Sequence, residues 1–283
     1  FGLFMIIWLT SYPKSGNTWL RTIASQILFF NQISKDNPLE KISEIKNYPK
    51  LVYFKELTKN PENVEEIVKN WNLSQDVINL QKKIRIFKTH NIFCNFGKYS
   101  FSNLKNTAGV IQIVRDPRNV VSSIKEHYSI INEEKAVEFL MNENKWLLDM
   151  NKNIPPTFIS SWRLHYNSWK KFPKNHLLIK YESLLKDPTK IIEKVYKYLQ
   201  TFFKVNLSDE NLIQISKNTS FEKLKEAENK GYFNENVYDH QTNLKKDFFN
   251  LGPKNDWKEK LQKKNIDTIE KEFEIEMKEL NYL

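Results

Sequence analysis

The strongest sequence constraint on the fold of this chain is a short apolar strand that runs through a tight turn into a helix. Residues 6–9 are apolar, and the turn that follows carries Lys14, Gly16 and several hydroxyl side chains. Such a turn directs backbone N–H groups, the positive end of a helix and one cation toward a phosphate or sulfate. It differs from a Walker A loop, in which the lysine follows the second glycine, because Lys14 precedes Gly16 by two positions. Residues 6–20 therefore predict an anion-binding strand, turn and helix, and a purely structural turn is the alternative.

Length and composition favour one globular domain. The 283 residues suit a single large α/β domain, residues 1–283, since no linker, low-complexity tract or internal repeat interrupts them. The formal net charge is +10, and the lysines are dispersed among acidic residues, which is typical of a solvated surface around an anion site. A nucleic-acid binder is the alternative that this charge permits, but no helix-turn-helix, zinc-finger or RNA-recognition pattern accompanies it. We therefore expect no nucleic-acid partner.

The N-terminal apolar run and the cysteine content bear on location. Residues 1–9 are too few to cross a bilayer and lead directly into the anion-binding turn, so we expect a first strand and no membrane span. Cys94 is the single cysteine, so no disulfide forms within the chain, which is typical of a reducing compartment. We expect a cytoplasmic protein.

A histidine follows the second predicted strand. Residues 84–87 alternate as a short strand, and Lys88, Thr89 and His90 come directly after it, where α/β sheets present ligand-contacting side chains. An imidazole titrates near neutral pH and can take a proton from an attacking hydroxyl, so His90 is a candidate general base. A surface loop histidine is the alternative.

An arginine and a serine follow the third predicted strand. Residues 110–114 form an apolar run interrupted by Gln112, which is typical of a central parallel strand, and Arg115 comes next. Pro117 favours a helix start, and that helix carries Ser123 eight positions after Arg115. Strand-end and helix-face geometry can direct both side chains to one phosphate. An ion pair between Arg115 and Asp116 is the alternative.

The remaining pattern predicts the fold class. A fourth apolar strand at 176–179 precedes a helical pattern at 189–199, and strands separated by helices imply a parallel sheet with crossover connections. We expect an α/β domain with a central parallel sheet flanked by helices, similar to P-loop kinases, and a helix with Pro61 in its first turn. Residues 266–280 carry an apolar stripe that fits a terminal helix. The stripe packs in the core or forms a subunit contact, so a homodimer is one of the two alternatives.

Together these segments resemble the PAPS-dependent sulfotransferases of the cytosolic type, as a bacterial-like member, where PAPS is 3′-phosphoadenosine 5′-phosphosulfate. The turn at 11–19, the Lys-Thr-His at 88–90, the segment 115–123, the strand end at Tyr181 and the segment 219–221 follow in the family's order. The resemblance implies that His90 is the catalytic base and that Lys14 and Lys88 contact the sulfate. It also implies that the donor is bound by Ser15, Gly16, Asn17, Thr18, Trp19, Arg115, Ser123, Tyr181, Thr219, Phe221 and Gly252.

Two departures from the family pattern concern this site. The family continues Lys-Thr-His with Leu-Pro, whereas this chain has Asn91-Ile92, which affects the loop toward the acceptor. The family's C-terminal loop reads Arg-Lys-Gly, two residues, then Gly-Asp-Trp-Lys, and here Asn250 and Leu251 replace the arginine and lysine expected at the 3′-phosphate. The backbone near Gly252, with Lys254, is left for that phosphate.

The resemblance implies an enzyme that transfers the sulfuryl group from PAPS, its co-substrate, to a hydroxyl or amine and releases adenosine 3′,5′-bisphosphate without a metal. The acceptor is expected to be a small molecule or a saccharide, bound by loops near 52–57, 93–101 and 232–243, which are rich in Phe, Tyr and Asn. A nucleotide-dependent phosphotransferase is the alternative that the architecture supports. It needs a Walker A loop or a Mg²⁺-holding acidic residue after a strand, and the sequence shows neither.

Overall fold

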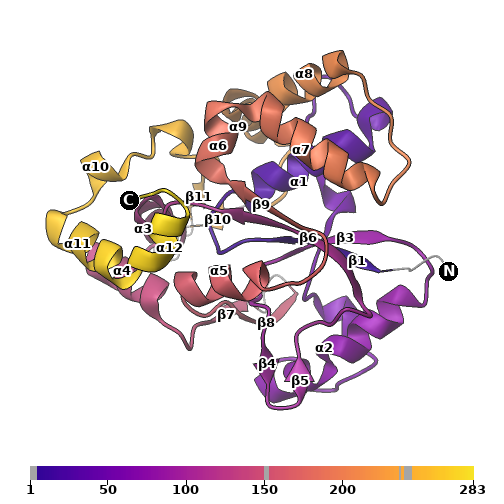
Figure 1. Ribbon diagram of the computed structural model, residues 1–283, viewed down its shortest axis with the longest axis horizontal. Helices are drawn as coiled ribbons and strands as arrows, with labels where there is room; N and C mark the ends of the chain where they lie inside the picture. The colour runs from indigo at the N-terminus through magenta and orange to yellow at the C-terminus, as the bar shows by residue number, and fades with distance from the viewer. Residues whose placement is uncertain (1–4, 150–152, 236, 239–243) are drawn as a thin grey trace. The chain divides into compact units, whose positions relative to one another are not determined.

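The computed structural model describes residues 5–149, 153–235, 237–238 and 244–283 (Figure 1). These residues group into two compact units that interleave along the chain. The first unit comprises Phe1–Tyr12, Ile45–Val114 and Met141–Leu178, and the second comprises Pro13–Glu44, Arg115–Leu140 and Ile179–Leu283. The expectation of one domain over residues 1–283 stays a prediction.

A five-stranded sheet organises the first unit. Its strands are β1 (Ile6–Thr10), β2 (Lys46–Asn47), β3 (Arg85–Thr89), β6 (Thr107–Val114) and β9 (His176–Lys180), the last of which ends in the second unit. The strand order is β2-β3-β1-β6-β9. β1 runs parallel to β3 and β6 on either side of it, and β2 runs parallel to β3 (Figure 1). The central parallel sheet expected from the sequence is confirmed.

The two central strands are buried along their whole length. Every residue of β1 and of β6 is buried, which explains their mainly apolar sequences. The indole Nε1 of Trp8 donates a hydrogen bond of 2.9 Å to Thr107 Oγ1, so the polar atom of this core side chain is satisfied. The register pairs Thr10 with Thr89, so β1 and β3 end level with each other. The residues that follow these two strands therefore start from the same edge of the sheet.

Helices α2 (Val64–Asn79) and α5 (Trp162–Lys170) flank the sheet within the first unit. Trp71 of α2 and Trp169 of α5 are fully buried in the same aromatic-rich cluster as Trp8 of β1. Large aromatic side chains such as these bury much apolar area and stabilise the unit. The smaller elements of the unit are η3 (Leu51–Tyr53), β4 (Asn95–Phe96), β5 (Tyr99–Ser100), β7 (Trp146–Asp149) and β8 (Ile154–Phe158).

The second unit consists mainly of helices. They are α1 (Asn17–Leu28), α3 (Pro117–His127), α4 (Glu133–Met141, whose last residue belongs to the first unit), α6 (Tyr181–Lys186), α7 (Pro188–Gln200), α8 (Asp209–Asn218), α9 (Phe221–Asn229), α10 (Trp257–Lys260), α11 (Lys263–Glu272) and α12 (Glu274–Glu279), with η1 (Phe30–Gln32), η2 (Ile42–Glu44), η5 (Gly252–Lys254), β10 (Val237–Tyr238) and β11 (Lys245–Lys246). α1 packs against α7 and α8 (Figure 1). Asp-Pro pairs start two of these helices: Asp116 caps α3 and Asp187 caps α7, and the following proline suits the first helical position.

Three element boundaries differ from the prediction. Lys88 and Thr89 belong to β3 and do not follow it. The helix predicted with Pro61 in its first turn begins at Val64, because Asn63 caps it by accepting hydrogen bonds from two backbone N–H groups of the first turn. The terminal helix is two helices that break at Phe273. The apolar stripe continues across that break, so the pattern could not reveal it.

None of the helices within the described ranges combines the length and apolar composition that a bilayer crossing requires.

Candidate active site

The turn between β1 and α1 contains two residues with a positive φ. Lys14 adopts a left-handed conformation with φ 63°, and Gly16, with φ 101°, is the N-cap of α1. A non-glycine residue in the left-handed region of φ/ψ space is strained, and such residues are frequent at functional sites. The first turn of α1 carries no acidic residue and has no side-chain cap. The positive end of the α1 dipole is therefore not neutralised by an acidic side chain in its first turn, which favours an anion at this helix start.

Buried polar atoms line the same turn. Ser15 is fully buried, and its Oγ has no hydrogen-bond partner among the described residues. The same holds for Nε1 of Trp19, in the first turn of α1. Asn17 and Thr18 are buried in the first turn of α1. A buried polar atom without a partner costs about 1–3 kcal/mol, so a polar ligand that paired with these atoms would stabilise the turn.

Two residues that the sequence analysis did not single out hold the Lys14 side chain. Its Nζ lies 3.4 Å from Nδ1 of His127 and 4.4 Å from the ring centroid of Phe248. The ring provides a cation–π contact, and His127 comes from the last turn of α3. His127 lies four positions after Ser123 on that helix, so helical spacing was the signal that could have found it.

Arg115 connects the turn to α3 and α6. Its Nη1 donates to the carbonyl oxygen of Lys14 at 3.1 Å and to Ser123 Oγ at 3.2 Å. The guanidinium lies 4.2 Å from the ring centroid of Tyr181. The Nε of Arg115 is buried and has no hydrogen-bond partner among the described residues. The structure therefore brings Lys14, Arg115, Ser123 and Tyr181 together.

The Asp116 carboxylate is engaged elsewhere. Its Oδ2 lies 2.6 Å from Nη2 of Arg118, and its Oδ1 accepts from the backbone N–H of Arg118 as the cap of α3. The described residues include no ion pair between Arg115 and Asp116. This leaves the positive charge of Arg115 for a ligand.

Aromatic side chains border this part of the second unit. Trp19 meets Tyr181 edge-on with ring centroids 5.6 Å apart. Trp19 and Phe221 both pack against one apolar cluster, formed by Leu39, Ile42, Leu224, Ala227, Phe233 and Phe249. Thr219 is buried, and its hydroxyl donates to the carbonyl oxygen of Ile215. An adenine between Trp19 and Phe221 stays a prediction.

Gly252 lies directly against the Phe221 ring. A Cβ at this glycine would lie 2.3 Å from Cε2 of Phe221, and the φ of Gly252 is +49°. Both the close approach and the left-handed backbone require glycine here. Gly252 therefore positions the aromatic ring that the resemblance assigns to adenine.

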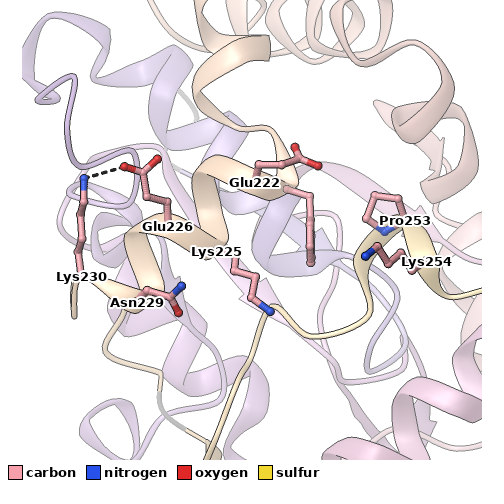
Figure 2. Close-up of a pocket in the computed structure, with 8 residues that line it drawn as sticks. Glu222, Lys225, Glu226, Asn229, Lys230, Pro253 and Lys254 are labelled. Atoms are coloured by element: carbon pink, nitrogen blue, oxygen red, sulfur yellow. Dashed lines mark hydrogen bonds and ion pairs between the residues drawn. The ribbon is translucent and has the colours of Figure 1, made fainter.

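A pocket of about 610 Å³ lies along α9 (Figure 2). Its lining is Phe221, Glu222, Lys225, Glu226, Asn229, Lys230, Pro253 and Lys254. Of the predicted donor residues, this lining contains Phe221. Lys254, which the sequence analysis left for the 3′-phosphate, is exposed here, and Asn250 is exposed as well.

His90 is held at the end of β3 in the first unit. Its Nδ1 lies 2.8 Å from the carbonyl oxygen of Ser11, directly after β1, and 3.3 Å from Ser11 Oγ. A carbonyl only accepts, so Nδ1 carries the proton, and Nε2 has the lone pair in the neutral imidazole. This is the tautomer that a base acting through Nε2 needs.

A second histidine supports His90. His165 is buried, and burial lowers its pKa to about 3, against a smaller opposing effect of a hydrogen bond with the backbone of His90. His165 is therefore neutral near pH 7 and holds the backbone of His90 without adding charge. Lys88, half-buried in β3, and His90 belong to the first unit, whereas Lys14 and the predicted donor residues belong to the second.

In the described part of the chain, no group of three or more His, Cys, Asp or Glu side chains is placed to hold a metal ion. Independence from metal stays a prediction.

Comparison with known proteins places the chain in a family. The model of the sulfotransferase domain matches residues 6–281. The 3-beta-hydroxysteroid sulfotransferase of Cavia porcellus is 29% identical over 224 residues, which cover 78% of this chain and 67% of that protein. The 3-alpha-hydroxysteroid sulfotransferase of the same organism is 28% identical over 228 residues, which cover 77% of this chain and 65% of that protein. The match therefore spans about two thirds of the length of each of these two relatives. Human sulfotransferase 2A1 is 26% identical over 275 residues, covering 96% of this chain and 84% of the relative.

Solved structures share the fold. Retinol dehydratase in complex with androsterone and the inactive cofactor PAP has a TM-score of 0.60 at 18% identity, covering 96% of this chain and 80% of that one. Mouse sulfotransferase SULT7A1 complexed with PAP has a TM-score of 0.57 at 20% identity, covering 97% and 85%. The predicted P-loop-like α/β fold is thereby confirmed. The chain belongs to the sulfotransferase domain family, and the enzyme class predicted from its sequence, a PAPS-dependent sulfotransferase, is confirmed at the level of that family.

Proposed function

We propose that the chain transfers the sulfuryl group of PAPS to a hydroxyl or amine of a small acceptor and releases adenosine 3′,5′-bisphosphate. The observation that carries the proposal is the contact of Arg115 with both Lys14 and Ser123. One arginine thereby joins an anion-binding turn to a second phosphate-binding pair. A donor with a 5′-phosphosulfate and a 3′-phosphate needs two such anion sites.

The donor residues have distinct roles in this proposal. The turn from Ser15 to Thr18, with Gly16 and Asn17, binds the 5′-phosphosulfate through N–H groups and hydroxyls. Arg115 and Ser123 bind the 3′-phosphate. Trp19 and Phe221 stack on adenine, Gly252 allows Phe221 to approach, and Tyr181 and Thr219 contact the nucleotide. Buried polar atoms at Ser15 and Arg115 support a polar ligand at both anion sites.

Catalysis in this proposal uses three side chains. His90 removes the acceptor's proton through Nε2 as the acceptor oxygen or nitrogen attacks sulfur, and the bond from sulfur to the bridging phosphate oxygen breaks. The proton moves to His90, and the leaving phosphate takes the electron pair. Lys14 and Lys88 stabilise the charge that develops on the leaving and equatorial oxygens. No metal takes part.

The acceptor is proposed to be a small hydroxyl-bearing or amine-bearing molecule. Relatives with this domain are named for hydroxysteroids and amines, and the retinol dehydratase structure contains androsterone. In this chain, the segment 93–101 presents Phe96, which is 37% exposed, and the segment 52–57 presents Val52, which is 53% exposed. The third predicted acceptor loop, 232–243, lies partly outside the described residues. Assay with radiolabelled PAPS over phenols, alcohols, amines and saccharides identifies the acceptor class.

The remaining expectations stay proposals of the same kind. A cytoplasmic location rests on the single Cys94, and a homodimer rests on the apolar stripe near the C-terminus. A nucleic-acid partner is not proposed, because the positive charge is dispersed along the chain.

Nucleotide binding tests the proposed function directly. Adenosine 3′,5′-bisphosphate is expected to raise the Tm more than adenosine 5′-monophosphate, and a hundredfold excess over Kd stabilises the native state by about 2.7 kcal/mol. Arg115→Ala is expected to abolish the difference. Equal shifts in the wild-type protein would remove the 3′-site and the PAPS proposal with it. Strongly salt-dependent binding to unrelated DNA without a nucleotide shift would favour the nucleic-acid alternative.

A further inference from the structure

Asn255 lies between η5 and α10 and is 6% exposed. Its Nδ2 donates to the carbonyl oxygen of Asn119 at 2.8 Å and to Ser123 Oγ at 3.2 Å. A backbone carbonyl only accepts, so Nδ2, not Oδ1, must face Asn119. The orientation of the buried amide is therefore fixed, and its N–H₂ group is directed at α3.

Ser123 Oγ receives a second hydrogen bond, from Arg115 Nη1 at 3.2 Å. A hydroxyl has two acceptor lone pairs and one proton, and neither a guanidinium nor an amide N–H₂ group can accept. Both lone pairs of Ser123 are therefore occupied. Within the described ranges no acceptor for the Ser123 proton is present, so the proton is available to an acceptor outside the protein. A phosphate oxygen is such an acceptor.

We propose that Asn255 is a positioning residue that makes Ser123 a committed hydrogen-bond donor to the 3′-phosphate. The proposal rests on the donor site proposed above. Asn255 acts through Ser123, and it adds specificity for a 3′-phosphorylated nucleotide without touching the nucleotide. It comes from the same loop in which Asn250 and Leu251 stand where the sequence analysis expected basic residues. The amide of Asn255 supports the proposed 3′-phosphate site through Ser123. The basic side chains expected at positions 250 and 251 would have supported that site through their charge.

A purely structural role for Asn255 predicts something different. Asn119 also accepts from the backbone N–H of Trp257 through Oδ1, so the 119–255 contact could serve only to anchor the loop to α3. Asn265 provides a matched control in the same unit. It is 6% exposed, and its Nδ2 donates to Glu133 Oε1 and thereby anchors α11 to α4. Loss of an anchoring amide is expected to lower stability at both positions, but only Asn255 is expected to affect the choice of nucleotide.

The test measures Kd for adenosine 3′,5′-bisphosphate and for adenosine 5′-monophosphate by calorimetry on the full chain. Asn255→Ala is expected to reduce the ratio of the two affinities by about fivefold to tenfold, because one polarising hydrogen bond to Ser123 is lost. Asn265→Ala is expected to lower the Tm and leave the ratio unchanged. If circular dichroism shows that Asn255→Ala does not fold, the same two affinities are measured on Asn255→Ser.

A double-mutant cycle with Ser123→Ala separates action through Ser123 from a general effect on the loop. In the Ser123→Ala background, Asn255→Ala is expected to change the ratio less than twofold, because the hydroxyl that it orients is gone. An unchanged ratio in Asn255→Ala, or an equal effect with and without Ser123, overturns the proposal while the donor site stands. A wild-type protein that does not prefer the 3′-phosphorylated nucleotide overturns the proposed function itself.

Discussion

The Lys14 carbonyl oxygen accepts a hydrogen bond from Arg115 Nη1, so the left-handed residue of the turn before α1 is tied to the segment that leads into α3. Lys14 has a left-handed backbone, which is disfavoured by about 1–2 kcal/mol for a non-glycine residue and persists only where other contacts determine it. Arg115 is such a contact. It therefore has two roles in the proposed donor site, in binding one phosphate and in shaping the turn for the other.

This relationship predicts that Arg115→Ala weakens binding of adenosine 5′-monophosphate as well, although that nucleotide has no 3′-phosphate. The expected loss is about fivefold, since one hydrogen bond that holds the turn is removed. Ser123→Ala, which leaves the turn tethered, is expected to reduce affinity only for adenosine 3′,5′-bisphosphate. Calorimetry on both variants checks this. Unchanged monophosphate affinity in Arg115→Ala would show that the turn keeps its shape without the tether.

His90 and Lys14 are expected to differ in what their removal changes. His90→Ala is expected to lower turnover by about 10²-fold or more and to leave the affinity for adenosine 3′,5′-bisphosphate near that of the wild type, because a base acts on the acceptor. Lys14→Ala is expected to lower both turnover and nucleotide affinity, because a cation that contacts a charged oxygen stabilises the ground state as well as the transition state. His176→Ala, another half-buried histidine of the first unit, is the control. Substantial turnover in a folded His90→Ala protein would end the catalytic assignment.

Gly252→Ala is expected to weaken adenine-nucleotide binding by roughly tenfold, because the new methyl group would displace the Phe221 ring. Gly231→Ala is the matched control. Gly231 also has a positive φ, of +79°, but no atom lies within 4 Å of where its Cβ would be. Both variants are expected to lose stability from backbone strain, and thermal unfolding measures that loss. Equal nucleotide affinities in the two variants would separate Phe221 from the adenine site.

The buried imidazole of His165 makes stability depend on pH. Burial lowers its pKa in the folded protein to about 3, whereas an exposed histidine in the unfolded chain has a pKa near ~6.5. Between these values the unfolded state binds more protons, so the free energy of unfolding falls as pH decreases below ~6.5, by up to about 1.4 kcal/mol per pH unit. His165→Gln is expected to remove this share of the slope. Urea unfolding of both proteins from pH 7 to pH 5 checks it, and parallel slopes would contradict the assignment.

Cys94 is expected to be unreactive in the native protein. Burial raises the pKa of its thiol to about 12, so almost no thiolate exists at pH 8. Alkylation by iodoacetamide at pH 8 is expected to be at least about 10²-fold slower in the native protein than in urea, where the thiol recovers an ordinary pKa. Mass spectrometry over time measures both rates. Similar rates would show that the thiol is accessible in the folded protein.

Sequence patterns predicted the parts of the fold that repeat locally. β1 and β6 were predictable because every residue in them is buried and their sequences are mainly apolar. The convergence of Arg115 on Ser123 was predictable because a strand end and the first turns of the following helix have fixed geometry. The donor role of that pair stays a prediction, as do the other site assignments.

Residues that act across long sequence distances were not predictable in this way. Asn255 and Ser123 are 132 positions apart, and nothing local to either indicates their hydrogen bond. His165 sits in an ordinary amphipathic helix, and its contact with His90 depends on tertiary packing. Such contacts are fixed by topology, which a single sequence expresses only weakly.

The core of the first unit joins Trp8 to Trp169, whose ring centroids are 6.3 Å apart although about 160 residues separate them in the chain. During synthesis at about 5–20 residues per second, the first strand is made roughly 10–30 s before its helical partner leaves the ribosome. The first strand is also among the most apolar segments of the chain, so it spends this interval as a nascent segment that a chaperone can bind. We expect the yield of folded protein to depend on translation rate and on chaperone supply.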